Sequence, residues 1–293
     1  MIKPLLQDNA FLTDVRQARS EPGHFHLWWL GQSGFLIQWQ ARHILLDPYL
    51  SDSLTKKYAE TDKPHVRMTE RVVAPECLDF IDVVTSSHNH TDHLDAETLK
   101  PILQFNRDLT LIVPEANREF VVERLGIPRN FPVGLDAGTT ATAAEFKITG
   151  VPAAHEAVET DALGRCRFLG YIVEFGPWTV YHSGDTVMFE GMDESLRRWD
   201  IDLALLPING GAPERRVAGN LNGCEAARLA KEIGARLVVP CHYEMFEFNT
   251  ASPEELVKTA QEVQQSFRLL KAGERWSSAE LHRAFPGLHA FDK

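Results

Sequence analysis

A chain of 293 residues, of which 44% are hydrophobic and 24% are charged, can bury a core of full size without cross-links. The formal net charge of −11 argues against a nucleic-acid partner, because phosphate backbones are held mainly by Lys and Arg. No apolar run is long enough to span a bilayer, and the first residues reach a charge too soon for a signal peptide. We therefore expect a cytoplasmic protein that forms one domain over residues 1–293.

The cysteines give no sign of a structural metal site or of an oxidising compartment. They are Cys77, Cys166, Cys224 and Cys241. None belongs to a CxxC pair, which a zinc knuckle would require. We expect all four to be small buried side chains.

The first half of the chain alternates predicted strands with predicted helices. Short apolar runs bounded by turn residues predict strands at 26–30, 35–39, 42–46, 82–86 and 109–113. A helix is expected from Asp95, a good N-cap, to about residue 105. Another is expected over 114–125, where Gly126 provides the common C-terminal stop.

The second half repeats this order of elements. Its predicted strands are 168–175, 178–182, 202–206, 236–240 and 267–270. Asn222 can cap a helix that runs through residue 233, and Ser252 can cap another that has Pro253 at its first position. Two sheets packed face to face, with helices on the outer faces, satisfy this pattern. We therefore predict an α/β fold that is a four-layer αββα sandwich.

The run His88-Asn89-His90-Thr91-Asp92-His93 places three histidines and an aspartate within six residues. It follows the predicted strand 82–86, at the position where open α/β sheets commonly place their sites. His88 and His90 can point the same way from an extended loop, while Asp92 and His93 can face a second point nearby. Imidazole and carboxylate ligands suit zinc, manganese or iron. The alternative interpretation is a polar loop with exposed histidines, which this density of ligands disfavours.

The sequence resembles the metallo-β-lactamase superfamily, whose signature is H-x-H-x-D-H after a strand. In that family, further ligands come one at a time from later strand ends. The corresponding residues occur here in the family's order: Asp47 after an early strand, then His155, Asp185 in a Gly-Asp pair, and His242. The match covers about residues 26 to 245 and implies the family's αββα fold.

The resemblance also implies a site for two divalent metal ions, of zinc, manganese or iron. The first ion would be held by His88, His90 and His155. The second would be held by Asp92, His93 and His242. Asp185 would bridge the two ions, and Asp47 would orient a ligand imidazole through its second nitrogen. We expect His182, close to a ligand in sequence, to pack nearby or to support a ligand.

Two cations about 3.5–4 Å apart can hold a bridging hydroxide at neutral pH, which suits hydrolysis without a covalent enzyme intermediate. Asp92 is the candidate catalytic residue, because it would orient the hydroxide and receive its proton. The superfamily's flavin-linked diiron oxygen reductases usually carry Glu where this chain has His90. His90 therefore favours a hydrolase, and a mononuclear iron oxygenase is the alternative.

Three further stretches look like the branch that contains L-ascorbate-6-phosphate lactonase and N-acyl-phosphatidylethanolamine phospholipase D. They are residues 31–35, 183–186 and 240–243. We therefore expect hydrolysis of a small ester or lactone, phosphorylated or not. The alternatives are hydrolysis of a lipid or nucleotide phosphodiester and, from another class, a catalytically silent metal-binding scaffold. The complete set of ligands disfavours the scaffold. The oligomeric state stays open.

Substrate contacts are expected from loops near the ligands. Arg215 and Arg216, among glycines beside a helix start, could bind phosphate or form a solvated loop. A long early segment could cover the site, although solvated charge is the favoured interpretation of its Lys56, Lys57, Arg67 and Arg71. Tyr243, Phe246 and Phe248 are further candidates to face a substrate.

Overall fold

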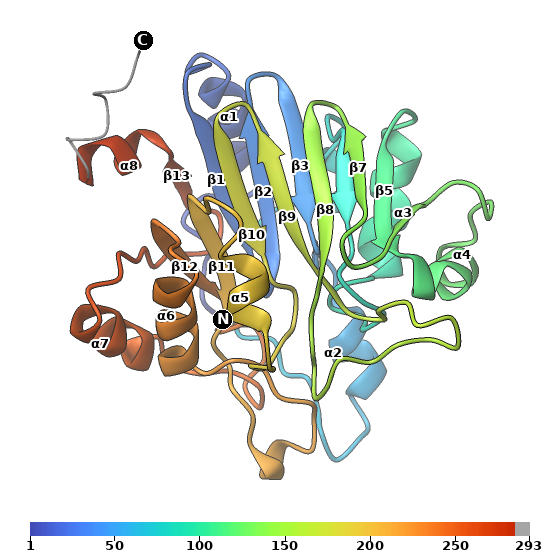
Figure 1. Ribbon diagram of the computed structural model, residues 1–293. Helices are drawn as coiled ribbons and strands as arrows, with labels where there is room; N and C mark the ends of the chain where they lie inside the picture. The colour runs from blue at the N-terminus through green and yellow to red at the C-terminus, as the bar shows by residue number, and fades with distance from the viewer. Residues whose placement is uncertain (285–293) are drawn as a thin grey trace.

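Two β-sheets packed face to face form the centre of the molecule, as the computed structural model shows for residues 1–284 (Figure 1). The last part of the predicted domain, residues 285–293, lies outside the described residues. The first sheet has the order β13 (Arg275–Ser277), β1 (Phe25–Gly31), β2 (Gly34–Trp39), β3 (Arg42–Leu46), β4 (Val83–Thr85), β5 (Thr110–Pro114), β6 (Val133–Leu135). The second sheet has the order β12 (Leu237–Cys241), β11 (Leu203–Pro207), β10 (Trp178–His182), β9 (Leu169–Phe175), β8 (Phe146–Pro152), β7 (Thr140–Ala143).

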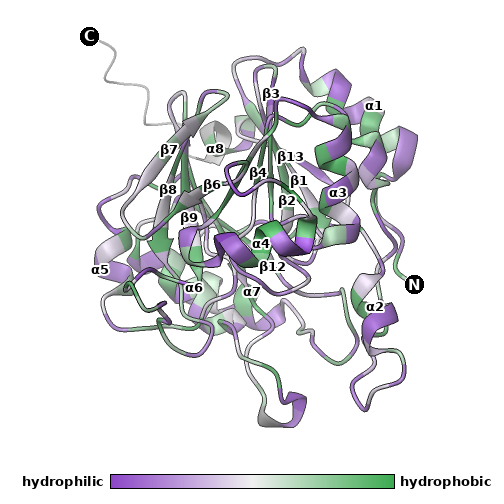
Figure 2. Cartoon of the chain, turned by 90° about the vertical axis from the view of Figure 1, so that its right-hand side faces the viewer, coloured by the Kyte–Doolittle hydropathy of each residue, from purple (hydrophilic) through white to green (hydrophobic). Residues whose placement is uncertain are grey.

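Helices cover the outer face of each sheet, so the predicted four-layer αββα sandwich is confirmed (Figure 2). The first sheet is covered by α1 (Asp8–Ala18), α3 (Ala96–Phe105) and α4 (Arg118–Leu125). The second is covered by α5 (Met192–Leu196), α6 (Gly223–Glu232) and α7 (Glu254–Glu262). The shorter helical elements are α2 (Ser53–Tyr58), η1 (Pro75–Cys77), η2 (Glu115–Asn117), η3 (Pro213–Arg215) and α8 (Ala279–Ala284). Within residues 1–284, none of the helices has the length and apolar character needed to cross a membrane.

Strand β1 shows how both faces of a sheet are used. All seven of its residues are buried. Leu27 and Trp29 face the core between the two sheets, while Trp28 and Leu30 pack under the helices of the first sheet. A strand covered on both faces gains from apolar residues at every position, which explains the apolar run from Leu27 to Leu30; His26 is the one polar side chain buried in this strand.

The direction of the strands determines where the site can form. Strands β3 to β6 are parallel to one another, and so are β10 to β12. Strand β8 runs antiparallel to β9, which runs antiparallel to β10, so β8 shares the direction of β10. The loops that leave these strands therefore gather at one edge of each sheet, where open α/β sheets bind their ligands.

Capping residues lie at the predicted ends of three helices. Asp95 accepts hydrogen bonds from the backbone N–H groups of Glu97 and Thr98 at the start of α3. Asn222 forms a reciprocal capping box with Glu225 at the start of α6. Gly126 ends α4 with a φ of 68°, a left-handed conformation that a residue without Cβ adopts at low cost.

Four local predictions are wrong or need adjustment. The expected strand 267–270 makes one isolated bridge, between Phe267 and Val238, and the three-residue β13 closes the first sheet instead. The expected helix 114–125 is divided because Pro114 ends β5, so that a 3₁₀ turn precedes α4. Pro253 lies before α7 rather than inside it. Cys77 is exposed because it lies in a surface 3₁₀ turn, whereas Cys166 and Cys241 are buried as expected.

Candidate metal centre

The run from His88 to His93 forms the loop between β4 and α3, at the carboxyl end of a central strand of the first sheet. His88 and His93 are buried, whereas His90 is exposed. The loop is a closed turn, because the backbone N–H of His93 donates to the carbonyl oxygen of His90 at 3.1 Å. Arg124 from α4 braces it by donating to the carbonyl oxygen of Asn89 at 2.7 Å.

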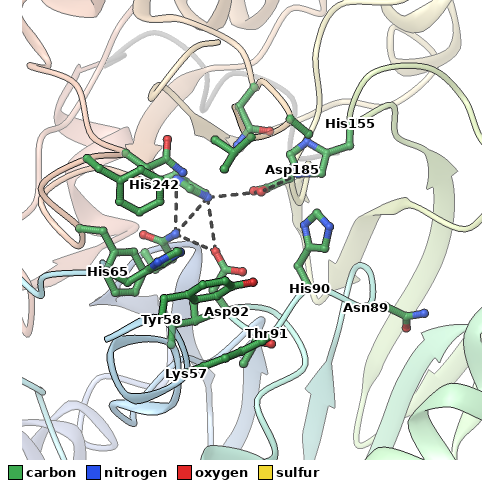
Figure 3. A pocket seen from close by; sticks show the side chains of 18 of the residues that line it. Lys57, Tyr58, His65, Asn89, His90, Thr91, Asp92, His155, Asp185 and His242 are labelled. Carbon is green, nitrogen blue, oxygen red and sulfur yellow. Dashed lines mark hydrogen bonds and ion pairs between the residues drawn. The ribbon is translucent and has the colours of Figure 1, made fainter. Parts of the chain in front are cut away.

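The second sheet brings the remaining predicted ligands to the same place. His155 follows β8, Asp185 follows β10 and His242 follows β12. Two groups of ligand atoms result, and the atoms of each group lie within 4.8 Å of one another. Figure 3 shows the members that line the pocket: His90, Asp92, His155, Asp185 and His242. The first group comprises His88, His90, His155 and Asp185. The second group comprises Asp92, His93, Asp185 and His242.

Asp185 belongs to both groups. Its Oδ1 lies 3.2 Å from Nε2 of His93, and its Oδ2 lies 3.3 Å from Nε2 of His242. The same Oδ2 is 3.6 Å from Nε2 of His155. One carboxylate thus lies between histidines of both groups, which is the position that a bridging ligand requires.

Unpaired buried atoms make the cluster suitable for metal ions. Nε2 of His88 is buried and has no hydrogen-bond partner. Nε2 of His93 and Oδ1 of Asp185 are also buried without a hydrogen bond, although they lie 3.2 Å from each other. A buried polar atom without a partner costs about 1–3 kcal/mol, and a bound cation would satisfy such atoms. The mixture of imidazoles and carboxylates suits zinc, manganese or iron, so the residues present fit a metal centre.

Neighbouring groups hold the ligand imidazoles through their other nitrogen. Oδ2 of Asp47 is 2.6 Å from Nδ1 of His93, which is the kind of contact expected for Asp47. Nδ1 of His155 is 2.9 Å from the carbonyl oxygen of Gly219. Ser87 extends this network, because its backbone N–H donates to Oδ1 of Asp47 at 2.9 Å. Such contacts fix the tautomer that leaves Nε2 free for a metal.

Gln32 lies in the stretch 31–35, but its contacts in the site were not predicted. Its Nε2 donates to Oδ2 of Asp92 at 2.8 Å, and its backbone carbonyl accepts from the backbone N–H of His242 at 3.0 Å. Both Gln32 and His242 have positive backbone φ values, 51° and 62°, which residues other than glycine rarely adopt. This hydrogen bond between the two strained residues fixes where the His242 ring enters the cluster.

The charges inside the cluster oppose one another. Burial lowers the pKa of His88 well below its ordinary value, so this ring is neutral and can bind a metal. Burial would also lower the pKa of His242, but the nearby Asp185 carboxylate outweighs it and raises the pKa to about 9. Burial would raise the pKa of Asp185, but His242 and His93 outweigh it and hold the pKa well below the usual range. A metal ion that binds here must therefore displace protons from histidines of the second group.

A pocket of about 320 Å³ opens onto both groups. Its floor contains His90, Asp92, His155, Asp185 and His242. Its wall includes Gln32, Leu54, Lys57, Tyr58, His65, Asn89, Thr91, Arg124, Val217, Ala218, Asn220, Phe246, Phe248 and Asn249. The early segment that could cover the site does border the pocket. Of its four candidate basic residues, Lys57 alone lines the pocket, together with Tyr58 and His65.

Several other candidate residues do not reach the pocket. Arg215 donates to the carbonyl oxygens of Asn209 and Thr250, so its guanidinium is used to join two loops. Arg216 pairs with Asp62 at the surface. Of the two interpretations left open for these arginines, the structure favours a surface loop over phosphate binding in this pocket, because both guanidinium groups have partners outside it.

Tyr243 and His182 have packing roles. Tyr243 stacks on Trp29 with ring centroids 4.6 Å apart, and its hydroxyl donates to the carbonyl oxygen of Leu270. It is absent from the pocket wall, because it points away from the side that carries His242. His182 is buried, with Nε2 3.0 Å from the carbonyl oxygen of Ser33, and packs edge-on against Phe35.

Comparison with known proteins agrees with this geometry. A family model described as a beta-lactamase superfamily domain matches residues 26–242. A UPF0173 metal-dependent hydrolase of Rubrobacter xylanophilus is 29% identical, covering 87% of this chain and 98% of the relative. One from Pyrococcus abyssi is 30% identical, covering 78% and 89%. The metallo-beta-lactamase fold protein YhfI from Bacillus subtilis superposes with a TM-score of 0.62 at 21% identity, covering 87% of this chain and 99% of that one.

The fold, the two ligand groups and the relatives together define an enzyme of the metal-dependent hydrolase class. The chain belongs to the metallo-β-lactamase superfamily.

Proposed function

We propose that this enzyme hydrolyses a small ester or lactone with two divalent metal ions, of zinc, manganese or iron. The observation that carries the proposal is the pair of ligand groups that share Asp185 at the bottom of one pocket. His88, His90 and His155 would hold one ion, and Asp92, His93 and His242 the other. When bound, such ions lower the pKa of a water molecule and polarise a substrate carbonyl.

Asp92 is the proposed catalytic residue among the side chains of the pocket. Burial would raise its pKa, but His93 and His242 outweigh this effect and lower the pKa, so the carboxylate is ionised at neutral pH. Gln32 holds Oδ2 in place. The other oxygen, Oδ1, can then accept a hydrogen bond from the attacking water, orient it towards the carbonyl and take its proton.

The pocket volume suits a small molecule, or a small part of a larger one, beside the metal centre. A cavity of about 320 Å³ is at the small end of the range for ligand pockets. An ester or lactone of one or two rings fits such a space, whereas a phospholipid would have to leave its chains outside. This limit favours the lactonase-like interpretation over hydrolysis of a lipid phosphodiester.

Metal content and substrate class test the proposal. We expect about two metal ions per chain after purification under metal-replete conditions. Aliphatic lactones and p-nitrophenyl esters should be hydrolysed at least tenfold faster than bis-p-nitrophenyl phosphate. Asp92→Ala should abolish turnover while the protein stays folded, and Asp108→Ala, in an exposed turn, is the matched control. A metal-free protein, or equal turnover of Asp92→Ala and the wild type, would contradict the proposal.

A further inference from the structure

Four aromatic side chains form one side of the metal pocket, and we call this group the aromatic recess: Tyr58, His65, Phe246 and Phe248. Tyr58 and His65 are stacked, with ring centroids 4.2 Å apart and an angle of 19° between the planes. Phe248 and Phe246 meet His65 at steep angles, with centroids 4.4 Å and 5.1 Å away. In Figure 3, Tyr58 and His65 lie on the side of the pocket that carries Asp92 and His242, away from His90.

The recess is held in shape by its own backbone. Its residues come from two segments far apart in sequence, which pair where Arg67 bridges Phe246. The backbone N–H of Glu247 donates to the carbonyl oxygen of Val66 at 3.1 Å, beside the bridge. Phe246 is fully buried, whereas Tyr58 and Phe248 are partly exposed to the pocket. The rings are therefore positioned before any ligand binds, which reduces the entropy cost of binding.

The Lys and Arg side chains of the pocket are poorly suited to hold an anionic substituent. Arg124 borders the pocket, but its Nη1 donates to the carbonyl oxygens of Asn89 and Leu94. Among the described Lys and Arg side chains of the wall, Lys57 alone has no hydrogen bond or ion pair, and it is exposed, with Nζ 5.0 Å from the centre of the Tyr58 ring. A substrate phosphate far from the reacting carbonyl would meet one exposed ammonium, and an arginine whose Nη1 is already held by two backbone carbonyls.

We infer that the aromatic recess selects the substrate: an ester or lactone that carries a flat, uncharged, aryl or unsaturated group seated against Tyr58, His65 and Phe248. This inference rests on the proposed function and adds the substrate class. Aromatic pairs in edge-on or offset geometry contribute beyond the burial of area alone. The recess offers a stacked pair and two edge-on rings, the surfaces that a flat ring uses in both geometries.

Matched lactones test the inference. The first pair is 3-isochromanone and δ-valerolactone, which both release a primary alcohol and differ by a fused aryl ring. The second pair is 6-phosphoglucono-δ-lactone and glucono-δ-lactone, which differ by a phosphate. For the metal-loaded wild type, we expect kcat/KM to favour the aryl lactone by at least tenfold and the phosphate to give no advantage.

Two variants show whether the recess causes the preference. Phe248→Leu and Tyr58→Leu keep apolar bulk but remove a ring, and each should reduce the aryl preference several-fold. Phe105→Leu, which changes an exposed ring at the end of α3 outside the pocket, should leave both rates unchanged. Calorimetry on the metal-free protein gives a readout without turnover. The unreactive ketone 2-tetralone should bind at least tenfold more tightly than cyclohexanone, and less tightly to Phe248→Leu than to Phe105→Leu.

The outcomes separate the inference from the proposed function. An aryl preference that is unchanged in both recess variants overturns the inference and leaves the hydrolase intact. A tenfold preference for the phosphorylated lactone overturns it as well. A metal-loaded wild type that hydrolyses neither the four lactones nor the p-nitrophenyl esters overturns the proposed function, and the inference with it.

Discussion

The metal centre and the aromatic recess border the same pocket, yet they are built in different ways. The ligands of the metal centre follow β4, β8, β10 and β12 directly, so paired strands fix their positions. The recess is built where two loops meet through one isolated bridge between Arg67 and Phe246. The comparison indicates that strand ends position the metal ligands rigidly, whereas the loops determine the substrate specificity.

The strongest test of this difference removes the shared ligand. Asp185→Asn keeps the size of the side chain but loses the charge that faces both His93 and His242. We expect kcat to fall on the order of 10³-fold, because a neutral amide is a poor bridge between two cations. Steady-state kinetics and metal analysis would check this. Turnover within tenfold of the wild type would mean that the metal centre does not carry the chemistry.

The two regions should also differ in their response to pH. Metal binding must displace the proton that His242 holds up to a pKa of about 9, so metal affinity should rise with pH. Each displaced proton gives about tenfold per pH unit, so the proton of His242 alone accounts for roughly 100-fold between pH 6 and 8. Burial lowers the pKa of His65, so this ring stays neutral over most of that range. Binding of 2-tetralone to the metal-free protein should therefore change little. Titrations at pH 6, 7 and 8 would measure both, and a metal affinity independent of pH would contradict this account.

A smaller effect is expected from the contact that orients a ligand. Asp47→Asn weakens the acceptor that faces Nδ1 of His93, and such changes typically reduce metal affinity 10–100-fold. Competition with a chromophoric chelator would measure the change. Asp79→Asn, at an exposed position, is the control. If Asp47→Asn binds metal as tightly as this control, His93 is oriented by the fold alone.

The smallest effect is expected at the loops around the recess. Arg215→Ala removes the charged hydrogen bonds that join the loops at Asn209 and Thr250, and the free energy of unfolding should fall by about 1–2 kcal/mol. Metal content should not change. Arg216→Ala, which removes an exposed ion pair, should have little effect. Urea unfolding would compare the two variants, and a loss of metal in Arg215→Ala would contradict the separation between loops and metal centre.

The same difference explains what the sequence could predict. The run from His88 to His93 is dense and follows a clear apolar strand, so its position at a strand end was predictable. The hydrogen bond from Gln32 to Asp92 was not predictable, because the sequence of a turn does not reveal that one of its residues has a positive φ. Tyr58 and His65 show no periodicity, and only the tertiary bridge brings them to Phe246. The strand β13 was missed for a related reason, since three residues are too few to show an alternating pattern.

Each ligand group also joins parts of the chain that the fold otherwise keeps in separate layers. His88, His90, Asp92 and His93 belong to the first sheet, while His155, Asp185 and His242 belong to the second. Ions bound as proposed would cross-link the two sheets at the edge where their loops meet. Ligands that exist as a cluster only in the folded chain turn binding free energy into folding free energy. Chelation should then do more than stop turnover, because it would let the two halves of the sandwich separate more readily at that edge.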